Sequence, residues 1–299
     1  MSAISLAVCG ATGAGKVRTN NEDAFAVSDL TRGERALVSL IRTRVNVGDR
    51  GVLLVVSDGM GGEKAGEVAS ALAITALCEH LAGTAETEDA AARLCAAVEH
   101  ANARVVAAAS DAERKGMGAT VTALFISGDH AVTAEVGDSR AYVLREGVLT
   151  QITKDQTYMQ LLVERGLIAP QAVGSSQAKN VILQAIGKAP QVVVAQRRLA
   201  LRRGDRLLLC SDGLFNEVPD ADLCEVLTST WLLGEACGRL MEMANDAGGR
   251  DNITLLLAEC DGEGLPAARD GEPFADTLTT LREFSVGESP GDPTGDPDV

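Results

Sequence analysis

Hydrophobic residues along the chain fall into short, separate runs, several of them divided by Gly-Asp turns. Short apolar runs bounded by turn residues are typical of strands in antiparallel sheets. The predicted strands cover residues 4–9, 51–56, 119–126, 131–136, 141–144, 192–199, 206–210 and 253–258.

Two long alanine-rich segments, 65–82 and 89–109, carry apolar residues at helical spacing and follow each other between two groups of strands. Two further helices are predicted at 220–228 and 234–247, before the last strand. Because strands and helices come in blocks rather than in strict alternation, the pattern favours an α+β layered fold over a doubly wound parallel sheet. Residues 154–190 begin with a predicted helix, 154–165, and continue as a polar stretch typical of an insertion beside a site.

The composition changes near residue 260. The chain has 299 residues and a formal net charge of −15, and residues 261–299 hold ten acidic residues against two arginines, a net charge of −8. We therefore predict one folded domain over residues 1–260 and an acidic, Pro/Gly-rich disordered tail over 261–299. A protein of this charge repels a phosphate backbone, which excludes nucleic acid as a partner.

The cysteines and the N-terminus indicate the compartment. Seven cysteines form no Cys-x-x-Cys pair, and most lie in apolar runs, which is typical of a reducing compartment. The first residues lack the basic segment of a secretory signal, and no run reaches the ~20 apolar residues of a membrane span. These features predict a cytoplasmic protein without a membrane segment, and nothing in the sequence requires more than a monomer.

Four aspartates stand at the ends of strand-like runs, in the motifs SDGMGG, VGDSR, SDGL and RDNIT: Asp58, Asp138, Asp212 and Asp251. Because strand ends of one sheet can converge, these carboxylates would repel one another unless cations lie between them. Ligand sets made only of oxygen select hard cations such as Mg²⁺ or Mn²⁺. Gly59, beside the first aspartate, lets the backbone approach a ligand and offers its carbonyl as well.

A fifth polar motif, RTNNED at residues 18–23, stands just before another apolar run. Its Arg18 can hold a phosphoryl group with two parallel hydrogen bonds, which lysine does poorly. Its carboxylates, Glu22 and Asp23, can orient metal-bound waters.

Six motifs follow one another in a familiar order over residues 4–259: RTNNED, SDGMGGEKAGEVAS, GMGAT, VGDSRAY, SDGL and RDNIT. In this order and spacing they resemble the metal-dependent protein serine/threonine phosphatases of type 2C, in their bacterial form. The resemblance implies a four-layer α-β-β-α sandwich, in which two central antiparallel sheets are flanked by helices. It also implies a dinuclear metal centre at one end of the sandwich and a flap over about residues 154–190.

The same resemblance implies a set of metal ligands. Asp58 would bridge two Mn²⁺ or Mg²⁺ ions, Asp212 and Asp251 would bind the first ion, and the Gly59 carbonyl would bind the second. Asp138, together with Asp212, would form a weaker site for a third ion.

Three more residues have implied roles around the metals. Glu22 would hold a water on the second ion, Asp23 would support that network through water, and Arg18 would bind the substrate phosphate. The catalytic residues would then be Arg18, Asp58 and Asp212. Two adjacent cations lower the pKa of a shared water and neutralise the attacked phosphate, so no phosphoenzyme is needed. The implied activity is hydrolysis of phosphoserine and phosphothreonine in proteins, opposing a serine/threonine kinase in bacterial signalling.

The sequence departs from the family at three places. Met60 follows Asp-Gly where many eukaryotic members have histidine, and Gln156 stands in KDQT where many bacterial members have histidine. Residues 175–180, SSQAKN, replace the usual histidine-proline segment of the flap. No general acid for the leaving alcohol is therefore assigned.

Two alternatives belong to other classes. GATGAGKV at residues 10–17 is close to a phosphate-binding P-loop, which would make the chain a nucleotide triphosphatase. Against this, Val17 cannot supply the hydroxyl that binds Mg²⁺, and the aspartates at 138, 212 and 251 would have no role. The other alternative is a catalytically silent signalling scaffold with the phosphatase fold, although such a protein would have no need of the acidic residues or Arg18.

Overall fold

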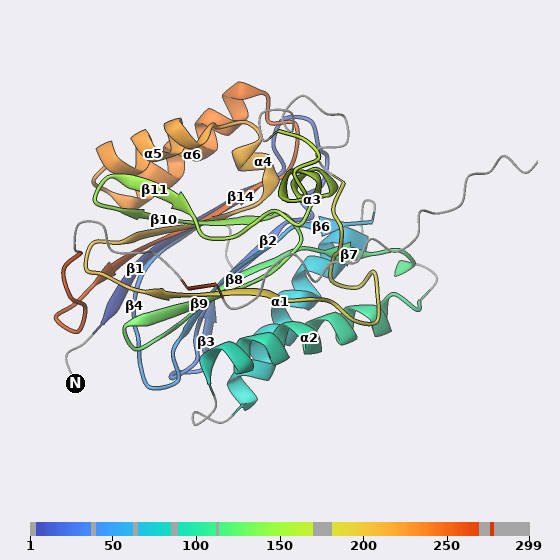
Figure 1. Ribbon diagram of the computed structural model, residues 1–299, viewed down its shortest axis with the longest axis horizontal. Helices are drawn as coiled ribbons and strands as arrows, with labels where there is room; N and C mark the ends of the chain where they lie inside the picture. The colour runs from blue at the N-terminus through green and yellow to red at the C-terminus, as the bar shows by residue number, and fades with distance from the viewer. Residues whose placement is uncertain are drawn as a thin grey trace, which may run out of the picture.

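Two antiparallel sheets packed face to face form the centre of the computed structural model, and helices cover both outer faces (Figure 1). The structure describes residues 4–36, 40–61, 65–84, 89–111, 114–169, 181–268 and 276–277. Helices α5 and α6 lie over one sheet, and α1 and α2 lie over the other. The predicted four-layer α-β-β-α sandwich is confirmed.

Each sheet combines strands from distant parts of the chain. The first sheet has the order β11 (Val148–Gln151), β10 (Arg140–Arg145), β13 (Arg206–Cys210), β14 (Ile253–Asp261), β1 (Ser5–Gly13) and β4 (Leu40–Asn46). The second has the order β15 (Asp276–Thr277), β12 (Ala195–Ala200), β9 (His130–Val136), β8 (Val121–Ser127), β5 (Val52–Ser57), β2 (Ala24–Asp29) and β3 (Glu34–Ala36). A small sheet pairs β6 (Gly59–Met60) with β7 (Gly118–Ala119).

The central strands are buried on both faces, which explains their uninterrupted apolar runs. In β5, Leu54 and Val56 face the opposite sheet, whereas Leu53 and Val55 face the helices. Successive side chains of a strand point to opposite faces, so a strand between two apolar layers needs hydrophobic residues at every position.

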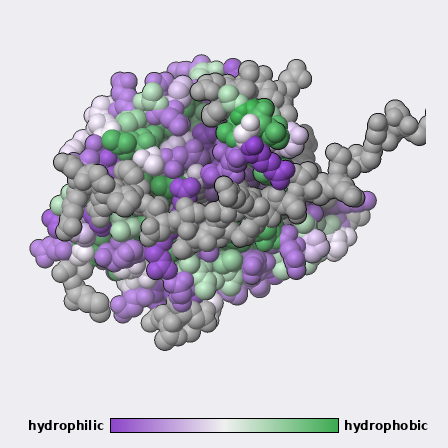
Figure 2. Space-filling model, in the orientation of Figure 1, coloured by the Kyte–Doolittle hydropathy of each residue, from purple (hydrophilic) through white to green (hydrophobic). Residues whose placement is uncertain are grey.

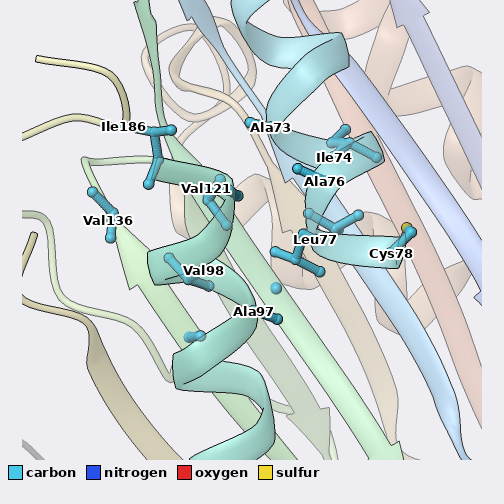
Figure 3. Close-up of a cluster of buried hydrophobic side chains, with 14 of the residues drawn as sticks. Ala73, Ile74, Ala76, Leu77, Cys78, Ala97, Val98, Val121, Val136 and Ile186 are labelled. Carbon is cyan, nitrogen blue, oxygen red and sulfur yellow. The ribbon is translucent and has the colours of Figure 1, made fainter. Parts of the chain in front are cut away.

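The long predicted helices are present as α1 (Ala65–Gly83) and α2 (Ala90–Ala108). Figure 3 shows Ile74, Leu77 and Val98 turned toward the second sheet, where Val121 and Val136 lie. The helix pair on the other face consists of α5 (Asp220–Ser229) and α6 (Leu233–Ala247). The short helix α4 (Asp212–Phe215) precedes this pair in the chain. Within the described residues, no helix is long and apolar enough to cross a membrane.

The predicted helix 154–165 is wrong at its start. The observed helix α3 is Tyr158–Glu164, and Thr157 accepts a hydrogen bond from the Gln160 backbone. The preceding residues are extended because Gln156 forms backbone hydrogen bonds with Gly137 and Leu183. Figure 2 shows a hydrophobic patch beside α3, in agreement with the 66% exposure of Leu167.

The start of the predicted tail packs against the sandwich. Strand β14 ends at Asp261, the Arg203 backbone donates to the Pro266 carbonyl at 2.9 Å, and Leu265 is 1% exposed in the core between the sheets. Residues 261–268 thus continue the fold, and β15 pairs with β12. The remainder of the predicted tail lies outside the described residues.

Replacing Leu265 with alanine is expected to lower the free energy of unfolding by about 3 kcal/mol, because it opens a cavity between the two sheets. The Asp251 end of the sandwich should be unaffected, since β14 separates it from Leu265. Urea unfolding measures the loss of stability. An unchanged unfolding free energy would show that this segment adds nothing to the core.

Candidate metal centre

The predicted acidic residues meet at one end of the sandwich. Asp58 follows β5, Asp212 begins α4 after β13, Asp251 precedes β14, and Asp138 lies between β9 and β10. All four line one cavity of about 370 Å³. The remaining residues that line the cavity come from four segments: Arg18, Glu22, Gly59, Met60, Gly61, Thr120 and Ile182.

Asp58 is held by its backbone. Its N–H donates to the Thr120 hydroxyl at 2.9 Å, and the Thr120 N–H donates back to its carbonyl at 2.8 Å. The next residue must be glycine, because a Cβ at Gly59 would collide with the carbonyl oxygens of Gly66 and Glu22. These contacts hold Asp58 and Gly59 at the cavity wall.

Glu22 is anchored by two residues that the sequence analysis did not single out. Its N–H donates to the Asn252 side chain at 2.8 Å, and its carbonyl accepts from the Ser70 hydroxyl at 2.6 Å. Asn252 lies in RDNIT and Ser70 ends the EKAGEVAS segment. The polar residues within these two motifs were the available signal, because a buried polar side chain must find a partner.

Asp23 lies behind the cavity rather than in its wall. It is 7% exposed, and its Oδ2 accepts a 2.6 Å hydrogen bond from the Ser211 hydroxyl. Its Oδ1 is buried without a hydrogen-bond partner among the described residues. Burial, partly offset by the hydrogen bond from Ser211, raises the pKa of Asp23 to about 8.

The crowding of carboxylates shifts their titration. Burial, followed by the charges of Asp23 and Asp212, raises the pKa of Asp58 well above its ordinary value. Burial and then Asp212 raise the pKa of Asp138 to about 7. Nearby cations reverse such shifts, because they favour the charged carboxylates.

The donor set fits hard divalent cations. It consists of carboxylate and carbonyl oxygens around one cavity, with a partnerless carboxylate oxygen of Asp23 close behind it. No three acidic, histidine or cysteine side chains of the described residues are already grouped as ligands of a single ion. Mg²⁺ is often bound by only one or two carboxylates and keeps several waters, so a cage of three side chains is not required.

Arg18 lies at the mouth of the cavity. Its Nη2 donates to Asp251 Oδ2 at 2.8 Å, and its side chain is 57% exposed. The loop before it is fixed by the Gly249 carbonyl, which accepts from the backbones of Lys16 at 2.7 Å and Val17 at 3.2 Å. Two interlocked loops therefore present the arginine and Asp251 together.

The P-loop alternative does not agree with this geometry. Gly10–Gly13 belongs to strand β1 and is not a loop, and residues 14–23 contain no helix. A P-loop needs a glycine-rich turn whose amides precede a helix N-terminus. The GATGAGKV segment lacks that structure.

Gln156 has a structural position rather than one in the cavity. Its side chain is fully buried, and its Oε1 accepts from the Gly137 backbone and from Gln184 Nε2, both at 2.8 Å. Its Nε2 donates to the Glu135 carbonyl at 3.0 Å. Gln156 thus joins the segment before α3 to the turn that carries Asp138. Met60 and residues 175–180 were the other two places where the sequence departs from the type 2C pattern. Met60 lines the cavity, whereas residues 175–180 lie outside the described residues.

Glu135 is the buried carboxyl group between the sheets near this turn. Its Oε2 accepts from the Lys154 backbone at 3.0 Å, and burial raises its pKa well above the ordinary value. The folded state therefore favours the protonated form, and this group costs stability as the pH rises from the unfolded-state value of about 4.3 toward the folded-state pKa.

Replacing Glu135 with glutamine is expected to leave stability unchanged below about pH 4 and to raise it at pH 8 by about 1 kcal/mol or more. The glutamine carbonyl can still accept from Lys154. Urea unfolding at both pH values measures the difference. A variant less stable than the parent at pH 8 would show that the ionised carboxylate is favoured inside the fold.

Comparison with known proteins agrees with this architecture. A protein-family model described as "Protein phosphatase 2C" matches residues 42–246. The serine/threonine protein phosphatase PstP of Mycobacterium tuberculosis is 39% identical over 247 residues, which cover 82% of this chain and 43% of PstP. The serine/threonine phosphatase Stp of Listeria innocua is 34% identical over 252 residues, covering 83% of this chain and 93% of Stp.

The chain is also similar to solved structures of bacterial serine/threonine phosphatases. The crystal structure of the M. tuberculosis phosphatase PstP/Ppp has a TM-score of 0.72 at 36% identity, covering 85% of this chain and 98% of that one. The PstP catalytic domain in complex with two manganese ions has a TM-score of 0.70 at 35% identity, covering 86% and 99%. The chain belongs to the protein phosphatase 2C family. It spans less than half the length of the full PstP sequence, although it covers most of Stp.

Proposed function

We propose that the chain is a metal-dependent protein serine/threonine phosphatase. The observation that carries the proposal is the convergence of Asp58, Asp138, Asp212 and Asp251 on one cavity with Arg18 at its mouth. The relatives named as serine/threonine phosphatases and the manganese-bound PstP structure support it.

In this proposal the acidic residues of the cavity and Gly59 hold the metal ions. Asp58 would bind two Mn²⁺ or Mg²⁺ ions, Asp212 and Asp251 would be ligands of the first, and the Gly59 carbonyl would be a ligand of the second. When bound, the two ions would supply a water of low pKa and neutralise the phosphate charge. Asp138 and Asp212 would bind a third ion more weakly.

The other residues act on water and substrate. Glu22 and Asp23 orient metal-bound waters, since the first lines the cavity and the second lies buried behind it. Arg18 binds two oxygens of the substrate phosphate, because its half-exposed guanidinium can turn from Asp251 toward a ligand in the cavity. Gln156 is not assigned as general acid, because its side chain is buried and its Oε1 and Nε2 are hydrogen-bonded within the fold.

The proposed substrates are phosphoserine and phosphothreonine in proteins, including those modified by a serine/threonine kinase that this phosphatase opposes. We propose a cytoplasmic catalytic domain over residues 1–260 that acts as a monomer and binds no nucleic acid. Residues 278–299 are expected to be dispensable for catalysis.

The substrate class is tested by phosphate release from phosphothreonine, phosphoserine and phosphotyrosine peptides and from ATP, in buffer with Mn²⁺. We expect release from the first two peptides. Hydrolysis of ATP alone would favour the nucleotide triphosphatase. No release from any of them, by protein shown to be folded, would favour the silent scaffold.

Replacing Arg18 with alanine is expected to raise KM for a phosphothreonine peptide about tenfold with a smaller change in kcat, because a charge-assisted pair of hydrogen bonds to phosphate is lost. Arg18→Lys should fall between the two, since lysine keeps the charge but not the planar fork. An unchanged KM in Arg18→Ala would remove this residue from the substrate site.

A further inference from the structure

Arg140 contacts several side chains around the candidate metal centre, although it does not line the cavity. It begins β10, two residues after Asp138. Its Nε donates to Asp155 Oδ1 at 2.8 Å, and its Nη2 donates to Asp155 Oδ2 at 2.6 Å. The two parallel bonds form a planar fork that fixes the orientation of both side chains. Arg140 and Asp155 are 21% and 17% exposed.

The same guanidinium also contacts the segment that carries Asp212. Its central carbon lies 3.8 Å from the centre of the Phe215 ring, at the end of the four-residue helix that Asp212 begins. Its Nη1 donates to the Tyr142 hydroxyl at 3.0 Å, and that hydroxyl donates to Asp220 at 3.1 Å. One side chain is thus in contact with the segments of both Asp138 and Asp212.

The turn between β9 and β10 is fixed on its other side as well. The Gly137 N–H donates to Gln156, the residue after Asp155. The Ser139 hydroxyl shares a 2.8 Å hydrogen bond with the Thr120 hydroxyl, which accepts from the Asp58 backbone. Gly137 and Ser139 thus hold the turn that carries Asp138, and the contact of Arg140 with Phe215 joins this turn to the helix that Asp212 begins.

We propose that Arg140 is a positioning residue that sets the spacing of Asp138 and Asp212 and thereby their affinity for a divalent cation. The inference rests on the proposed function, because it concerns ions bound by those carboxylates. Lysine cannot replace the arginine, since it lacks both the fork for Asp155 and the planar face that stacks on Phe215.

Strand β10 offers a matched control at its other end. Arg145 forms the same two-bond fork with Asp205, at 2.8 and 2.7 Å, and also donates to the Ala200 carbonyl. It lies about 17 Å further along the strand, and neither Asp205 nor Ala200 lines the candidate site. A lysine there removes the corresponding two-bond fork from the same strand, at the end away from Asp138.

The test compares Arg140→Lys with Arg145→Lys, using Mn²⁺ alone as the ligand. Electron paramagnetic resonance of free Mn²⁺ measures binding without substrate, and peptide hydrolysis gives the Mn²⁺ concentration for half-maximal activity. We expect Arg140→Lys to raise the Mn²⁺ dissociation constant of the lower-affinity site about tenfold, which corresponds to about 1.4 kcal/mol. The Mn²⁺ concentration for half-maximal activity should rise by a similar factor. Arg145→Lys should lower the thermal midpoint while Mn²⁺ binding stays at the parent value.

The outcomes separate this inference from the proposed function. A parent protein that binds no Mn²⁺ overturns both. In a second outcome, the parent protein binds Mn²⁺ and hydrolyses peptide while Arg140→Lys binds Mn²⁺ equally well. That result overturns this inference alone and gives the Arg140–Asp155 pair a purely structural role. Should Arg140→Lys not fold, Phe215→Leu removes the stacking ring and keeps an apolar side chain, and the same weakening is expected. Unchanged Mn²⁺ binding in Phe215→Leu would equally overturn the inference.

Discussion

Replacing Asp58 with asparagine is expected to lower kcat by about 1,000-fold or more while the protein stays folded. The charges of four other aspartates of the site act on its carboxylate. Two ions that shared this ligand would contribute several kcal/mol to transition-state stabilisation, and about 4 kcal/mol corresponds to 1,000-fold in rate. Asparagine has nearly the same shape, and the backbone hydrogen bonds with Thr120 do not involve the side chain.

The thermal stability of Asp58→Asn should rise although its kcat falls. In EDTA the thermal midpoint of Asp58→Asn is expected to rise, because one of several mutually repelling carboxylates is removed. Asp246→Asn is the control, since that side chain is 83% exposed and pairs with Lys16 at the surface. Its kcat should equal that of the parent. An Asp58→Asn enzyme within tenfold of parent kcat would contradict the assignment of this residue.

Replacing Asp205 with alanine is expected to lower the free energy of unfolding by about 3–5 kcal/mol. Asp205 and Arg145 are 1% and 3% exposed, and the carboxylate also accepts from the Arg202 backbone at 2.7 Å. Removing the carboxylate leaves the charge of Arg145 buried without its counter-ion. Since the whole stability of a domain is about 5–15 kcal/mol, the loss should be visible as a much lower urea midpoint.

Two further variants identify the cause. The double variant Arg145→Met with Asp205→Ala should recover part of the loss, because no uncompensated charge remains in the core. Glu79→Ala breaks an ion pair with Arg104 in which the side chains are 57% and 47% exposed, and it should cost at most about 1 kcal/mol. Equal losses in Asp205→Ala and Glu79→Ala would show that burial does not decide the effect.

The sequence predicted the central strands and long helices well, because doubly buried strands and alanine-rich helices leave strong patterns. Strands β2 and β4 were missed: β4 alternates arginines with apolar residues at the edge of its sheet. The start of α3 was misplaced for a reason outside the local pattern. Gln156 is extended because it pairs with Gly137 and Leu183, and such distant partners cannot be read from a helical period.

The residues that line the candidate site could be predicted from the sequence, whereas several residues that hold them in place could not. The motif aspartates line one cavity, as strand-end carboxylates that need cations should. The contacts of Thr120 and Asn252 were not foreseen, because a side chain that holds another residue's backbone carries no recognisable chemistry of its own. The contact of Arg140 with Asp155 was not foreseen either, because it joins residues that lie 15 positions apart in the sequence. The packing of Leu265 was hidden for another reason, since its neighbours have the composition of a disordered tail.

The most direct test of the central claim is hydrolysis of a phosphothreonine peptide by the parent protein and by Asp212→Ala, in EDTA and after addition of Mn²⁺ or Mg²⁺. The account predicts turnover by the parent only with added metal, and none by the variant under any condition. Turnover in EDTA, or by Asp212→Ala at the parent rate, would contradict a metal centre built on these carboxylates.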